Sequence, residues 1–172
     1  GDEMRLLVAC RPENDTRVVA VTLNEVYQIT LVPLIEKASV VVLGLGTSPH
    51  IEGLVHNQDA SLIAEIKKLT ESGKPMFGTG LGHQILALAG GCETLKLKYG
   101  HRGSNHPVMN TETGKTHITS QNHGYAVNAE KLPSNIKMTY KNINDNTCAG
   151  IEYADKPIFS VQFKTETLAG PN

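Results

Sequence analysis

Residues 76–84 combine a short apolar run, a Gly-x-Gly-x-Gly turn and the start of a helix. This layout is typical of a nucleophile elbow, in which one residue sits on a sharp turn between a strand and a helix. The N-terminus of the following helix lowers the pKa of a thiol at the apex and helps to bind an oxyanion. The apex here is Gly80, which has no side chain and therefore cannot attack a substrate.

Spacing alone leaves other interpretations of this turn open. The glycines could serve only to pack the strand closely on the helix. A dinucleotide-binding loop would need its third glycine one residue later, where His83 stands, and should lie in the first strand–helix unit of the chain. Thr79 neighbours the apex, but on a sharp turn the adjacent side chain points elsewhere, and its hydroxyl lacks a base.

Histidines and cysteines are the other residues that could carry chemistry. Four histidines lie in or near the central motifs, namely His83, His101, His106 and His123. Their spacings match no standard zinc pattern, and no carboxylates are interleaved with them. The cysteines Cys10, Cys92 and Cys148 are odd in number and widely spaced, which argues against a disulfide framework and against a cysteine-based zinc site. We therefore expect no metal site, no cofactor and a reducing compartment.

An α/β fold must position these residues. Apolar and β-branched runs predict strands over residues 4–10, 18–23, 28–33 and 40–45. Apolar spacing and terminal glycines predict helices over residues 61–72 and 81–89. Further short strands are expected at residues 76–78, 93–98, 117–120, 136–142, 151–153 and 159–163. This order predicts a parallel sheet with a smaller antiparallel addition, although residues 18–33 leave little room for a crossover helix.

Composition limits the class of protein. The chain has 172 residues, of which 40% are hydrophobic and 19% are charged, as in an ordinary globular domain. The net charge of −1 argues against a nucleic-acid binder that relies on bulk electrostatics. No apolar run approaches the length of a transmembrane helix, and residues 1–4 do not resemble a signal peptide. We expect one domain over residues 1–172, with neither a nucleic-acid nor a membrane partner.

Four sequence blocks follow one another along the chain: FGTGLGHQILALAGG from Phe77, YGHRGSNHPV from Tyr99, TSQNHGYAV from Thr119, and FSVQF from Phe159 with Glu166 and Gly170-Pro171 behind it. They resemble the blocks FGxCLGHQxxALAxG, FGHxGxNHPV, TxQNHGFAV and FSVQFHPExxxGP of class I (triad) glutamine amidotransferases. Within that family, the resemblance is to the glutaminase part of carbamoyl-phosphate synthase. It runs from about residue 40 to the C-terminus, whereas residues 1–35 match poorly.

The resemblance implies a flavodoxin-like class I glutamine amidotransferase fold, a three-layer α/β sandwich with a mostly parallel central sheet. It also implies a triad in which a cysteine thiolate attacks the glutamine side-chain amide, a histidine transfers the proton and a glutamate orients the histidine. In this chain the nucleophile position is Gly80 and the base position is Lys164, while the orienting carboxylate Glu166 is kept. Ordinary glutamine hydrolysis is therefore not expected.

The resemblance also assigns a glutamine-binding role to six positions, namely Gly46, Leu81, Gln84, Asn122, Gly124 and Tyr125. Leu81 keeps the backbone N–H that would face the oxyanion, and Gln84 lies one helical turn further on. The family's other oxyanion loop, SNGPGDP, reads GLGTSPH here, so that Gly46 survives and Ser48 replaces the second glycine.

Several functional hypotheses follow. The chain could dock on a carbamoyl-phosphate synthetase large subunit, or on fused synthetase domains, and support folding or regulation while free ammonia supplies the nitrogen. It could instead bind glutamine as a sensor without cleaving it, or catalyse a different reaction with Lys164 and Glu166. Gly80 and Lys164 could also mark a laboratory variant or a decayed copy of an active enzyme that supplied ammonia. The resemblance implies a cytoplasmic or mitochondrial-matrix location.

Overall fold

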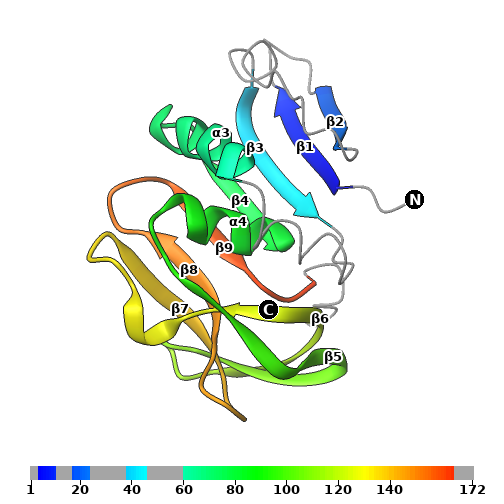
Figure 1. The fold of residues 1–172 in the computed structure, drawn as a ribbon, viewed down its shortest axis with the longest axis vertical. Coiled ribbons are helices and arrows are strands. Elements are labelled where there is room, and N and C mark those ends of the chain that lie inside the picture. Colours follow the sequence, from blue (N-terminus) through cyan, green and yellow to red (C-terminus); the bar gives the residue numbers. More distant parts are fainter. Residues whose placement is uncertain (1–3, 11–16, 24–37, 46–59, 165–172) are drawn as a thin grey trace.

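The computed structural model describes residues 4–10, 17–23, 38–45 and 60–164. The strand expected over residues 28–33 lies outside these ranges. The described strands are β1 Met4–Cys10, β2 Arg17–Leu23, β3 Ala38–Leu45, β4 Met76–Gly80, β5 Thr94–Asn110, β6 Thr116–Val127, β7 Ile136–Asn142, β8 Cys148–Tyr153 and β9 Ile158–Val161. They form one sheet in the order β2-β1-β3-β4-β9-β8-β6-β5-β7, with the N-terminal strands at one end and β5 and β7 at the other (Figure 1).

The centre of the sheet is parallel. Strand β4 pairs in parallel with both β3 and β9, and its register places Gly80 opposite Leu45 and Gly78 opposite Ser160. The carboxyl ends of these three strands therefore meet at one edge, which is where open α/β sheets place their ligands. The end of β4 at this edge leads directly into the next helix.

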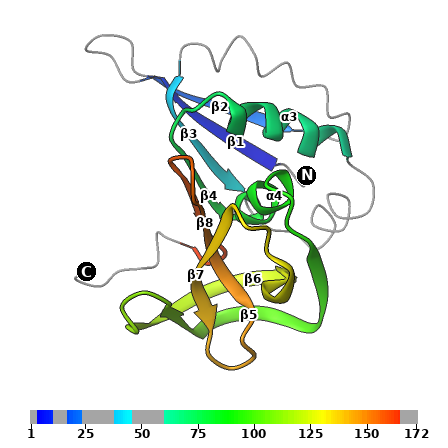
Figure 2. The same cartoon turned by 90° about the vertical axis from the view of Figure 1, so that its left-hand side faces the viewer.

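Two helices, α3 Ala60–Glu71 and α4 Leu81–Ala89, lie side by side in both views (Figures 1 and 2). They pack on one face of the sheet, in a core that includes Ile66, Leu86 and Ile158. Gly73 follows α3 at a φ of 78°, a left-handed conformation in which glycine ends a helix at little steric cost. The helices expected over residues 61–72 and 81–89 are thus confirmed.

The second half of the chain contains longer strands than expected. Strands β5 and β6 have 17 and 12 residues and pair antiparallel, with register shifts after Lys96 and after Gly103. The blocks that begin at Tyr99 and Thr119 therefore lie on paired strands. A second buried cluster forms here from Val108, Ala149, Val161 and Phe163.

The α/β class is confirmed, but the expectation of a mostly parallel sheet is wrong for the part of the chain that the structure describes. Parallel pairing there is confined to β3, β4 and β9, and the other pairs are antiparallel. Strands β1 and β2 form one of these antiparallel pairs.

Candidate functional site

The expected elbow is present at the end of β4. Gly80 adopts φ 58° and ψ −121° and forms the N-cap of α4 without a side-chain cap. Residues other than glycine adopt this conformation only under strain. Two residues earlier, a Cβ on Gly78 would lie 2.7 Å from Leu86 Cδ1 and 2.9 Å from the carbonyl carbon of Gly82. Strand β4 can therefore approach α4 this closely only because residue 78 is glycine. The turn thus has both features of a nucleophile elbow: an apex conformation that would strain any other residue, and close packing of strand and helix.

A chain of buried amides anchors the apex. Gln162 Nε2 donates to the Gly80 carbonyl at 3.2 Å, and its Oε1 accepts from Gln84 Nε2 at 3.0 Å. Gln84 Nε2 also donates to the Tyr125 carbonyl at 3.1 Å. Gln84 is fully buried and Gln162 is 2% exposed. Sequence reasoning assigned roles to Gln84 and Tyr125 but none to Gln162, although this residue stands in the last of the four blocks.

The predicted reactive positions differ in how far the structure describes them. Leu81 opens α4, whose first N–H groups have no partner within the helix and can therefore face an anion. Lys164 is exposed, and its backbone N–H donates to the Ser120 carbonyl at 3.0 Å, which ties the chain after β9 to β6. Lys164 follows the elbow anchor Gln162 by two residues. Gly46 and Glu166 lie outside the described residues.

The predicted substrate-binding segment 122–125 lies on β6. Asn122 is exposed, whereas Gly124 and Tyr125 are half-buried. The Tyr125 carbonyl accepts from Gln84 and also lies 2.7 Å from His123 Nδ1. The segment is therefore attached to α4, and through Gln84 and Gln162 to the elbow itself.

His123 begins a polar network that reaches the surface. Its Nε2 lies 2.7 Å from Gln121 Oε1 and 3.3 Å from His101 Nδ1, and His101 Nε2 lies 2.5 Å from Asp145 Oδ2. Burial lowers the pKa of His123 to about 3, so its ring is neutral and donates through one nitrogen. Burial would raise the pKa of Asp145, but hydrogen bonds from Thr147 and His101 outweigh this effect and lower it.

His83 is a structural residue of α4. Its Nδ1 lies 2.8 Å from Ser160 Oγ on β9, while its buried Nε2 has no hydrogen-bond partner. Burial lowers the pKa of His83 to about 3, with a smaller contribution from repulsion between His83 and His123 when both are protonated, and keeps the ring neutral. Among the described residues, no three histidine, cysteine, aspartate or glutamate side chains are grouped so that they could hold a metal ion.

The cysteines whose side chains are described do not reach the elbow. Cys92 and Cys148 are buried and unpaired. Burial raises the pKa of Cys92 to about 11 and that of Cys148 to about 12, so both thiols stay protonated at neutral pH. Cys92 also lies beyond the carboxyl end of α4, the end opposite Gly80. Neither thiol stands at the Gly80 turn, and both are buried.

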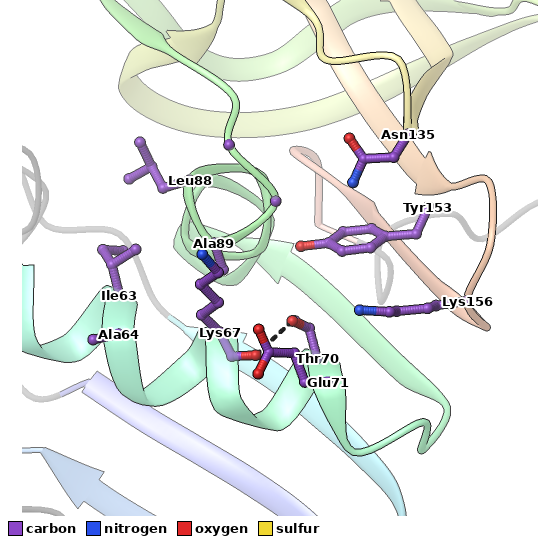
Figure 3. Close-up of a pocket in the computed structure, with 12 residues that line it drawn as sticks. Ile63, Ala64, Lys67, Thr70, Glu71, Leu88, Ala89, Asn135, Tyr153 and Lys156 are labelled. Atoms are coloured by element: carbon purple, nitrogen blue, oxygen red, sulfur yellow. Dashed lines mark hydrogen bonds between the residues drawn. The ribbon is translucent and has the colours of Figure 1, made fainter.

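A cavity of about 500 Å³ lies between α3 and the carboxyl end of α4. Figure 3 shows Asn135, Tyr153 and Lys156 pointing toward the two helices from the strand side. Tyr153 Oη donates to the Leu86 carbonyl at 2.7 Å. None of the predicted site residues lines this cavity, because Gly80 lies at the other end of the helix.

The chain resembles carbamoyl phosphate synthase small chains in sequence. It is 52% identical over 109 residues to the one of Neisseria meningitidis serogroup A, covering 63% of this chain and 29% of that protein. It is 48% identical over 117 residues to the one of Akkermansia muciniphila, covering 68% and 29%. It is 50% identical over 117 residues to the arginine-specific small chain of Aspergillus niger, covering 67% and 25%. The chain thus spans less than a third of the length of these relatives.

Solved structures agree on the fold. A glutamine amidotransferase of Thermotoga maritima superposes with a TM-score of 0.59 at 20% identity, covering 82% of this chain and 60% of that one. A glutamine amidotransferase of Methylobacillus flagellatus superposes with a TM-score of 0.57 at 14% identity, covering 75% and 52%. Within the described ranges, no helix is long and apolar enough to span a membrane. The family model for class-I glutamine amidotransferases matches residues 51–172, and the chain therefore belongs to this family.

Proposed function

We propose that this chain is the glutaminase-like domain of a carbamoyl phosphate synthase small chain and that it has lost glutamine hydrolysis. The observation that carries the proposal is Gly80 at the apex of a formed elbow. Glycine offers no atom that could attack the glutamine amide. Lys164 stands at the base position, in place of the histidine that the resembling family uses to transfer the proton.

The two described thiols support this proposal, because both are protonated and Cys92 is also far from Gly80. Helix α4 has nine residues and is about 13 Å long by helical rise, and Cys92 lies beyond its far end. Cys148 is buried on β8, where its Sγ–H donates to the Gly150 carbonyl at 3.3 Å. A thioester at either sulfur would require the surrounding core to open.

The test is a glutaminase assay on the purified protein, together with mass spectrometry for a glutamyl thioester. We expect neither glutamate release nor a covalent adduct. The matched control is Gly80→Ala, which also lacks a nucleophile at the apex and should be equally inactive. Turnover that is present in the wild type and unchanged in Gly80→Ala would reveal another nucleophile and overturn the proposal.

We further propose that the domain docks on a synthetase subunit and supports its folding or regulation while free ammonia supplies nitrogen. The relatives are named small chains, and this name supports the existence of a larger partner subunit. Co-sedimentation with a purified carbamoyl phosphate synthase large chain should give a complex that changes ammonia-dependent synthesis. A large chain that sediments alone and keeps its activity unchanged in the presence of this protein would contradict the docking role.

A second candidate function is glutamine binding without hydrolysis. It is favoured by the hydrogen bond from Gln84 Nε2 to the Tyr125 carbonyl, because this bond keeps the predicted binding segment attached to α4 and the elbow. Calorimetry with glutamine should then show saturable heat, with glutamate and asparagine as controls. An absence of heat at about millimolar glutamine, the range of weak specific ligands, rejects this function.

A further inference from the structure

The polarity of the amide chain beneath the elbow is unambiguous. The carbonyls of Gly80 and Tyr125 lie at its two ends, and a main-chain carbonyl can only accept. Gln162 must therefore turn Nε2 toward Gly80, which leaves its Oε1 to accept from Gln84 Nε2. Both side chains are buried, so a misoriented amide could not be satisfied by water instead.

The anchor on the Gly80 carbonyl determines where the next N–H points. The described peptide bonds are all trans. In a planar trans peptide the carbonyl and the N–H point in opposite directions. The carbonyl of Gly80 and the N–H of Leu81 belong to the same peptide plane. When Gln162 holds that carbonyl, it turns the Leu81 N–H away from the Gln162 side chain.

We propose that Gln162 is a positioning residue of this site, because it orients the Leu81 N–H by holding the opposite side of the same peptide plane. The inference rests on the proposed glutamine binding, with the Leu81 N–H facing the side-chain carbonyl of glutamine as the resemblance implies. Gly80 makes the anchor necessary, since glycine has a broad choice of backbone angles and could otherwise rotate this plane. Gln162 directly follows β9, and its backbone N–H donates to the Ala149 carbonyl on β8 at 2.9 Å, which fixes the segment from which the side chain extends.

Amide resonances test this orientation without any ligand. In Gln162→Met the donor is lost at similar side-chain length, and the Leu81 N–H and the Gly80 carbonyl resonances should both shift. The matched control is Asn142→Asp, another buried amide, whose Nδ2 has no partner in the structure and so loses no hydrogen bond. This control should leave both resonances in place. Unchanged Leu81 and Gly80 resonances in a folded Gln162→Met protein would overturn the inference.

Gln162→Glu adds a second readout, the pH dependence of the Leu81 resonance, which a merely structural role would not change. This variant also tests the inference if Gln162→Met does not fold. A protonated carboxylic acid can donate to the Gly80 carbonyl through its O–H, whereas an ionised one cannot. The Leu81 resonance of Gln162→Glu should therefore titrate and approach the wild-type position as pH falls. A Leu81 resonance that stays at the wild-type position at every pH would contradict the proposal.

Calorimetry then connects the orientation to glutamine. We expect Gln162→Met to weaken glutamine binding by about tenfold, as for one mis-set hydrogen bond, while Asn142→Asp stays within about twofold of the wild type. If the wild type binds no glutamine, the proposed binding function fails, and the resonances of Leu81 and Gly80 still decide the role of Gln162. If glutamine binds and Gln162→Met binds it equally well, the inference fails and the binding function stands.

Discussion

The two predicted reactive positions of this chain and the polar network beneath them differ sharply. Gly80 and Lys164 bear no thiol and no imidazole, whereas the amides of Gln84 and Gln162 form a continuous buried chain to the Tyr125 carbonyl. The network needs only amides and main-chain carbonyls, so it does not depend on the residue at the apex. The geometry of an elbow and its chemistry are therefore separable, because different atoms provide the two.

The largest expected effect comes from restoring the chemistry to the retained geometry. We expect Gly80→Cys combined with Lys164→His to produce glutamine hydrolysis at least about 100-fold above background, the scale of general acid–base catalysis. An assay of glutamate release measures this gain. The control is Gly80→Cys alone, which keeps the lysine and should stay much less active. If the double variant folds but gains nothing, the network does not hold a competent site.

The next effect is a dependence of stability on pH that arises from the network and its neighbour His83. The pKa values of His83 and His123 are lowered to about 3 in the folded state, against about 6.5 in an unfolded chain. Unfolding therefore takes up protons below about pH 6.5, so the free energy of unfolding falls as pH decreases. Each histidine contributes a slope of about 1.4 kcal/mol per pH unit.

Denaturant titrations of the wild type and of His123→Asn between pH 6 and pH 5 measure this slope. The variant should be less stable at pH 7, and its slope should be smaller by about 1.4 kcal/mol per pH unit, which is the share of one histidine. Half-buried His117 provides the control, since His117→Asn removes a histidine that is not part of the network. Equal slopes in the wild type and in His123→Asn would show that the network tolerates a protonated ring.

A smaller effect on the free energy of unfolding is expected from the backbone conformation of the apex. Gly80→Ala should lower the free energy of unfolding by about 1–3 kcal/mol, because φ 58° and ψ −121° strain any residue with a Cβ. Thermal and denaturant unfolding both report this change. Lys164→Ala, at an exposed position, should stay within about 0.5 kcal/mol of the wild type. A loss of similar size in both variants would refute backbone strain as the cause.

The smallest effect is expected at the surface end of the network. Asp145→Asn removes the carboxylate beside His101, but the Asp145 side chain is 38% exposed, so the pair contributes at most about 1 kcal/mol. Asp155→Asn, another exposed aspartate, is the matched control. A loss well above that of the control would mean that the surface pair and the buried amides act as one unit.

Local patterns predicted much of this fold. The bounds of α4 were predicted correctly, because apolar spacing and Gly90-Gly91 mark a helix and its end within a few residues. The apex at Gly80 was predicted from the glycine spacing of the turn. The lengths of β5 and β6 were not predicted from the sequence. His101, Arg102 and Asn122 have no strong strand preference of their own, and they join the strands only by pairing across the sheet.

The contacts of the candidate site needed the tertiary structure. Gln162 and Gly80 are 82 positions apart, and His101 and Asp145 are 44 positions apart. No periodicity or turn rule relates residues at such separations, since only the order of strands in the sheet brings them together. The role of Gln162 was missed for this reason, although its place in a family block was a usable signal.

The amino-acid sequence by itself determined that the turn has a glycine at its apex and that Lys164 stands at the predicted base position, since residue identity needs no coordinates. It also determined where the turn and its helix lie, because glycine and apolar spacing act over short distances. Only the tertiary structure decided which way the peptide between Gly80 and Leu81 faces. The physical reason is that a peptide plane next to glycine is set by its hydrogen-bond partner, and that partner, Gln162, follows a strand that is distant in sequence but adjacent to β4 in the sheet.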